Sequence, residues 1–176
     1  MNKPEMMRAF QKLDKHLKAT TRVIVGGGAA LIAAYDVPIS SQDVDGVPDK
    51  SSMELSEFKE EVRAVGRELG IPQDWLNDYF STFLFVLPSN YGDRLVPLYQ
   101  GKNLEVCALG KEDLILMKCF AGREKDIPHI RILLRKGADA KLVDERLSDL
   151  MEKNIPGANK ASDLFSDLCG EMGIDA

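Results

Sequence analysis

Hydrophobic residues recur at two spacings in the first half of the chain, one typical of helices and one typical of strands. Apolar side chains every three or four residues predict a helix over residues 4–19 and another over residues 54–69. The β-branched segment 22–25 predicts a buried strand, and segment 43–47 alternates in polarity as a half-buried strand does. Segment 29–35 predicts a short helix between these strands, so helices and strands alternate from the start.

The segment after Pro72 is harder to assign. A second helix is expected there, carrying Trp75, Leu76 and Tyr79. Residues 82–87 fit either a strand or a continuation of that helix, and residues 88–92 predict a loop. Two strands joined by a turn are then expected over residues 94–99 and 104–109.

The last third of the chain has apolar stripes at helical spacing throughout. Helices are expected over residues 111–122, 127–136, 139–153 and 158–171. A strand-containing part followed by a helical part is typical of an α+β fold. We therefore expect a small mixed sheet flanked by helices over residues 1–110, and a C-terminal helical bundle packed on it over residues 111–176.

Composition and charge are those of an ordinary globular chain and give no overall support for binding to nucleic acid or insertion into a membrane. Hydrophobic residues make up 44% of the chain, charged residues 29%, and the net charge is -5. Nucleic acid would therefore need a local basic patch, such as the cations of segment 123–136, which fit equally well a solvated helix face. No apolar run approaches the about 18 residues of a membrane span. The N-terminus lacks a signal-peptide pattern and the three cysteines form no disulfide pattern, so we expect a cytoplasmic protein.

A glycine-rich turn and a pair of acids carry the candidate chemistry. Gly26, Gly27 and Gly28 follow the first predicted strand and open a helix, where backbone N–H groups can approach a phosphate closely. Asp43 and Asp45 lie two residues apart on the next predicted strand, so their side chains share a face. Two neighbouring carboxylates repel each other unless a cation intervenes, and Mg²⁺ commonly joins such carboxylates to substrate phosphates.

A dinucleotide-binding turn is the alternative interpretation of the same glycines. That pattern needs Gly or Ala at its sixth position, where this chain has the bulky Leu31. The repeated strand–helix–strand units of a dinucleotide domain are also missing downstream, which disfavours this alternative.

The segment VIVGGGAALIAAYDVPISSQDVDGV resembles the signature of the DNA polymerase β-type nucleotidyltransferase superfamily. The later stretch DRLVPLYQGKNLEVCALGKEDLILMKCFAGREKDIPHIRILL is similar to bacterial nucleotidyltransferase-fold proteins related to abortive-infection toxins of toxin–antitoxin systems. Together the likeness covers about residues 22–136.

The resemblance implies roles for individual residues. Gly26 and Gly27 would hold the triphosphate, with Ser41 beside them, and Asp43 and Asp45 would bind Mg²⁺ or Mn²⁺. Further along the chain, Lys118 is implied for the nucleotide and Glu105 as a third catalytic carboxylate. Glu105 also fits an exposed strand residue, and Asp93 in a loop is the alternative carboxylate. The reaction implied is transfer of a nucleotidyl group from a nucleoside triphosphate to an RNA, protein or small-molecule acceptor, with a possible antitoxin protein as partner.

The chain also departs from the family pattern. Ile39 stands where many relatives have an Arg, and His129 where they often have a second Asp. These departures leave open a second hypothesis, a catalytically silent binding or regulatory protein of the same fold. Structural roles without a part in catalysis also fit Lys118 and Asp126. The Lys118 side chain would reach water along its helix, and Asp126 would cap the next helix.

Overall fold

The computed structural model describes residues 1–176, except for the side chain of Lys50. The chain divides into two compact units. The first comprises residues Met1–Thr82 and Leu95–Leu109, and the second comprises Phe83–Arg94 and Gly110–Ala176. One division between the units falls between Leu109 and Gly110, and the segment Phe83–Arg94 groups with the helical part.

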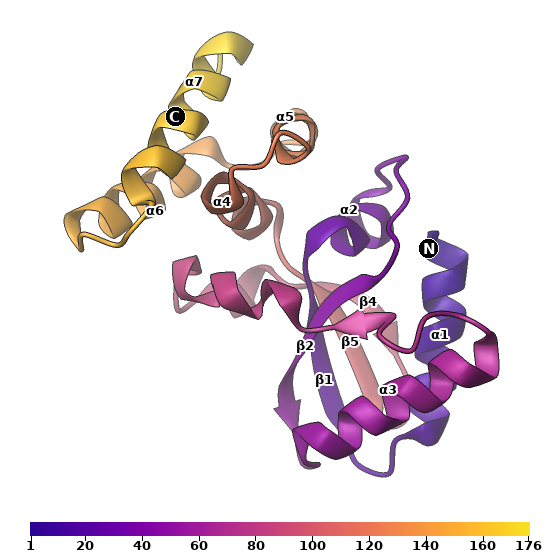
Figure 1. Cartoon of the computed structure of the whole chain (residues 1–176). Coiled ribbons are helices and arrows are strands. Elements are labelled where there is room, and N and C mark those ends of the chain that lie inside the picture. The colour runs from indigo at the N-terminus through magenta and orange to yellow at the C-terminus, as the bar shows by residue number, and fades with distance from the viewer. The chain divides into compact units, whose positions relative to one another are not determined.

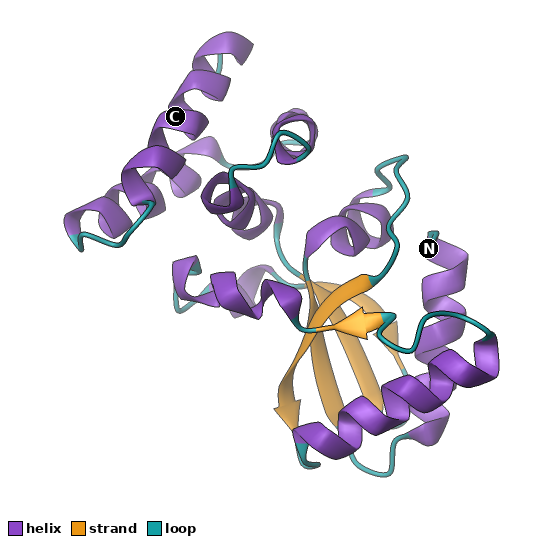
Figure 2. Ribbon diagram, in the orientation of Figure 1, coloured by secondary structure: helices purple, strands orange, loops and turns teal.

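Five strands form one mixed sheet in the first unit, in the order β3-β2-β1-β5-β4 (Figures 1 and 2). Their bounds are β1 (Thr21–Val25), β2 (Val44–Ser51), β3 (Leu76–Asn77), β4 (Val96–Gln100) and β5 (Leu104–Ala108). Strand β1 pairs antiparallel with β2 and parallel with β5. The α+β class with a small mixed sheet is thus confirmed.

Three helices accompany this sheet: α1 (Lys3–His16), α2 (Gly27–Tyr35) and α3 (Leu55–Leu69). Helix α1 begins at a capping box in which Asn2 and Glu5 exchange hydrogen bonds. Its buried Phe10 lies 6.0 Å, centroid to centroid, from the fully buried ring of Trp75. The Trp75 Nε1–H donates to the carbonyl of Val62 on α3 at 2.9 Å, so one indole ties both helices to the sheet.

The predicted helix after Pro72 is wrong. The chain there forms β3, which pairs parallel with the start of β2, and then a 3₁₀ helix, η1 (Tyr79–Val86). The Trp75 carbonyl accepts a hydrogen bond from the Val44 N–H at 2.7 Å, so pairing with β2 overrides a spacing that suited a helix. A second 3₁₀ helix, η2 (Tyr91–Arg94), occupies the end of the predicted loop and the start of the next predicted strand.

The second unit contains helices α4 (Lys111–Ala121), α5 (Asp126–Arg135), α6 (Ala140–Glu152) and α7 (Ala158–Met172). The four helices expected from the apolar stripes are confirmed, with ends shifted by a residue or two. No helix that the structure describes is long and apolar enough to span a bilayer.

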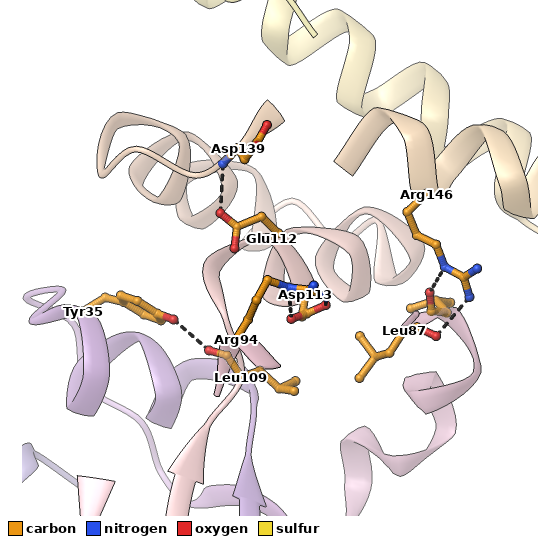
Figure 3. A network of polar contacts seen from close by, with 9 residues as sticks. Tyr35, Leu87, Arg94, Leu109, Glu112, Asp113, Asp139 and Arg146 are labelled. Carbon is orange, nitrogen blue, oxygen red and sulfur yellow. Dashed lines mark hydrogen bonds and ion pairs between the residues drawn. The ribbon is translucent and has the colours of Figure 1, made fainter. Parts of the chain in front are cut away.

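Polar contacts fasten the segments of the second unit to one another (Figure 3). Arg94 donates to both oxygens of the fully buried Asp113, at 3.0 and 2.7 Å. Burial raises the pKa of Asp113, and the Arg94 guanidinium opposes that shift. Arg146 donates to the carbonyls of Val86 and Leu87 at 2.9 and 3.0 Å, which holds the end of η1 against α6.

Asp14 on α1 anchors the turn between β4 and β5 in the first unit. Its carboxylate accepts backbone hydrogen bonds from Lys102, Asn103 and Leu104 at 3.2, 2.7 and 2.8 Å. Burial opposes ionisation of Asp14, but the hydrogen bonds from these N–H groups prevail and lower its pKa. Ionised Asp14 therefore holds the hairpin against the first helix.

We expect Asp14→Ala to lower the free energy of unfolding by about 1–2 kcal/mol, because three backbone donors lose a partly solvated charged acceptor. Urea denaturation followed by circular dichroism measures this. Because the pKa of folded Asp14 is lowered from 3.8, its contribution is present above that pH and is lost as pH falls through the lower folded value. The exposed Asp175→Ala is the control, and equal stability of the two variants at pH 7 would contradict the anchor.

Candidate functional site

The glycine-rich turn lies where β1 ends and α2 begins. Gly26 is the N-cap residue of α2, and its N–H donates to the carbonyl of Asp45 at 2.9 Å. None of the described side chains caps this helix, and its first turn holds no acidic residue. The N-terminal end of α2 thus presents the positive end of the helix dipole without a carboxylate of its own first turn.

Each glycine of the turn faces a different neighbour. A Cβ atom on Gly26 would lie 3.2 Å from the ring of Phe80, and one on Gly28 would lie 3.4 Å from the Ser41 hydroxyl oxygen. On Gly27 it would lie only 2.0 Å from Asp45 Oδ2, and Gly27 also has a left-handed φ of +57°. The Asp45 carboxylate therefore sits directly against the backbone of the turn, in space that only glycine leaves open.

Asp43 and Asp45 stand at the start of β2, close to this turn. Asp45 is the second residue of the strand, whereas Asp43 precedes its first residue, Val44. Both acids are half-buried. The structure thus brings Asp45 against Gly27 and Ser41 against Gly28, with Asp43 two residues before Asp45 in the chain.

Asn77 on β3 joins this group, and sequence reasoning missed it. Its Nδ2 donates to Asp43 Oδ2 at 2.9 Å, and its Cα is the register partner of Asp45. In a strand Trp75 and Asn77 share a face, so alternation of apolar and polar residues gives no signal for Asn77. The apolar spacing of this segment also fitted a helix, which is why the strand was not predicted.

Glu105 is not brought together with the acid pair. On β5 it is the register partner of Arg22, whereas the turn end of β1 is at Val25, whose register partner on β2 is Gly46. Three residues of strand correspond to about 10 Å. Burial raises the pKa of the nearby Cys107 thiol to about 11, and this thiol donates to Glu105 Oε1 at 3.6 Å.

Lys118 belongs to the second unit, on α4. Only 5% of it is exposed, and its ammonium donates to Asp126 Oδ1 at 2.8 Å and contacts His129 Nδ1 at 3.2 Å. Asp126 also accepts from Arg123 Nε at 2.7 Å. Asp126 therefore does not cap a helix as expected: it is the first residue of α5, and its side chain binds these cations instead.

Burial and neighbouring charges shift two pKa values in the cluster formed by Lys118, Arg123, Asp126 and His129. Burial tends to raise the pKa of Asp126, but hydrogen bonds from Arg123 and Lys118 outweigh it and lower that pKa. Burial and the neighbouring Lys118 charge lower the pKa of His129, so its neutral ring can accept a hydrogen bond from the Lys118 ammonium. The negative charge of Asp126 is thus compensated by two cations of the protein, Lys118 and Arg123.

The donor set around Asp43 and Asp45 fits a hard divalent cation shared with a ligand. Two carboxylates at i and i+2 supply hard oxygen donors, and Mg²⁺ commonly takes one or two carboxylates plus substrate phosphates. The Asp45 carboxylate lies against Gly27, at the helix end where a phosphate would bind. Among the described side chains, no group of three or more His, Cys, Asp or Glu is arranged to hold a metal.

The profile of a family described as "Nucleotidyltransferase of unknown function (DUF6036)" matches residues 5–167. No curated protein and no solved structure matches the chain.

The two neighbouring glycines should respond oppositely to alanine. We expect Gly27→Ala to destabilise the fold by at least about 1–2 kcal/mol, because of its left-handed φ and the approach of Asp45. Gly28→Ala adds a methyl group at ordinary contact distance inside a helix and should be neutral or stabilising by up to about 1 kcal/mol. Thermal and urea unfolding measure both, and equal effects would rule out the close approach at Gly27.

We expect Lys118→Met to destabilise the protein by about 3 kcal/mol, because it leaves Asp126 buried with only the exposed Arg123 as its cation. Urea unfolding measures this. In Lys118→Met/Asp126→Leu both buried charges are gone, so most of the lost stability should return. A Lys118→Met variant as stable as the wild type would show that the Lys118–Asp126 ion pair contributes little.

Proposed function

Because the chain belongs to the nucleotidyltransferase family of unknown function DUF6036, we propose that it transfers a nucleotidyl group from a nucleoside triphosphate to an acceptor at the site formed by the glycine turn, Asp43 and Asp45. The observation that carries this proposal is the contact of the Asp45 carboxylate with Gly27. It supports placing a metal-binding acid and a phosphate-binding helix end within reach of one ligand.

In this proposal the chain itself binds and orients the triphosphate. Backbone N–H groups at Gly27 and Gly28 and the dipole of α2 would hold phosphate oxygens. The Ser41 hydroxyl, which faces Gly28, would donate a further hydrogen bond. Phe80 closes the turn on the Gly26 side and keeps water from that part of the backbone.

The acid pair would set the position of the reacting phosphorus. Asp43 and Asp45 would bind Mg²⁺ or Mn²⁺, which when bound neutralises phosphate charge and polarises the bond to the leaving pyrophosphate. Positioning and charge neutralisation then account for catalysis, and no covalent enzyme intermediate is needed.

Two residues implied by the resemblance are left out of the proposed site. Glu105 lies at the level of Arg22, away from the turn. The Lys118 ammonium is bound by Asp126, which supports a structural role. An RNA, protein or small-molecule acceptor and an antitoxin partner stay predictions of the resemblance alone.

Isothermal titration of each nucleoside triphosphate with and without Mg²⁺ tests the proposal. We expect metal-dependent binding by the wild type and its loss in Asp43→Ala/Asp45→Ala, because the shared cation then has no protein carboxylates. Asp49→Ala, an exposed acid later on the same strand, is the matched control and should bind as the wild type does.

Two results would count against the proposal. Binding that survives in the Asp43→Ala/Asp45→Ala variant would place the nucleotide elsewhere. A folded wild type that binds no nucleoside triphosphate would favour the silent, regulatory alternative.

A further inference from the structure

The side chain of Asn77 is held in one orientation by two hydrogen bonds of opposite direction. The Tyr79 backbone N–H donates to Asn77 Oδ1 at 3.0 Å, and Asn77 Nδ2 donates to Asp43 Oδ2 at 2.9 Å. A backbone N–H can only donate, so the amide oxygen must face Tyr79. The NH₂ group is therefore directed at Asp43 and cannot exchange places with the oxygen without losing both bonds.

Asn77 is connected to both acids of the site through a firmly packed strand. Its side chain bonds Asp43, and its backbone lies opposite Asp45 in the β2–β3 ladder. The two residues before it, Trp75 and Leu76, are 0% and 7% exposed, so buried side chains fix the strand that carries it. Movement of Asn77 relative to the acid pair would require unpacking this part of the core.

The bond to Asp43 leaves the site with the charge that a cation needs. Asn77 engages Oδ2 with a neutral donor, so this hydrogen bond does not neutralise the negative charge of Asp43. A Lys or Arg in the place of Asn77 would compete with the cation, and an acid there would repel Asp43. Hydrogen bonds of this kind behind a metal ligand typically change metal affinity or activity by 10–100-fold.

We propose that Asn77 is a positioning residue that holds the Asp43 carboxylate in the orientation that binds the divalent cation. The proposal rests on the function proposed above and deepens it by naming the residue that supports one of the two acids. Asn77 itself contacts neither nucleotide nor acceptor in this role. Its effect reaches the reaction only through Asp43.

Titration of the protein with Mn²⁺ alone, followed by electron paramagnetic resonance, tests the proposal. The isosteric Asn77→Leu removes both hydrogen bonds and should weaken Mn²⁺ binding by about 10–100-fold. Asn77→Gln keeps an amide donor and should lose less than Asn77→Leu. Melting temperatures measured by circular dichroism should stay near that of the wild type for both.

The neighbouring Asp78 provides a matched control. Its carboxylate pairs with Lys59 of α3 at 3.1 Å, so it belongs to the same turn but serves another contact. Asp78→Asn should bind Mn²⁺ as the wild type does. A loss equal to that of Asn77→Leu would assign the effect to the turn as a whole and overturn the role of the Asn77 amide.

The remaining outcomes separate this inference from the function on which it rests. If the wild type binds no Mn²⁺, the proposed function fails and the inference fails with it. If the wild type binds Mn²⁺ and Asn77→Leu binds it equally well, the site stands and the positioning role of Asn77 is wrong. A loss shared by Asn77→Leu and Asp43→Ala, with Asn77→Gln intermediate, supports the proposal.

Discussion

The candidate site depends on one close approach, that of the Asp45 carboxylate to the backbone of Gly27. A Cβ atom on Gly27 would lie 2.0 Å from Asp45 Oδ2, so any other side chain would separate β2 from the turn. The approach is held by the hydrogen bond from the Gly26 N–H to the Asp45 carbonyl and by the antiparallel pairing of β1 with β2. The start of α2 and the position of the Asp45 carboxylate beside it are thus set by the same few atoms.

The acids Asp113, Asp126 and Asp43 have contrasting partners, which distinguishes a structural ion pair from a candidate metal ligand. Asp126 and Asp113 are buried against Lys118, Arg123 and Arg94, so their charges are balanced within the protein. Asp43 instead receives a hydrogen bond from the neutral amide of Asn77. A carboxylate held by a neutral donor keeps the charge with which it can bind a cation, whereas one paired with an internal cation does not.

Sequence reasoning found the local parts of the site and missed the part supplied by a distant strand. Gly26, Gly27 and Asp45 were recognisable because glycines after a strand and acids at i and i+2 carry their geometry in their spacing. Asn77 was missed because the segment around Trp75 has apolar spacing that fits a helix as well as a strand. Glu105 was chosen from its place on a predicted strand, but the register of β5 against β1 puts it level with Arg22.

The sequence by itself determined the α+β class, most helices and strands, and the residues of the glycine turn and acid pair, because these follow from periodicity and local spacing. Only the tertiary structure decided that β3 pairs with β2, that Asn77 bonds Asp43, and that Lys118 is buried against Asp126. Those facts depend on strand pairing and side-chain burial between segments far apart in the chain. Local sequence patterns do not indicate which distant segments come into contact, so only the tertiary structure could show these contacts.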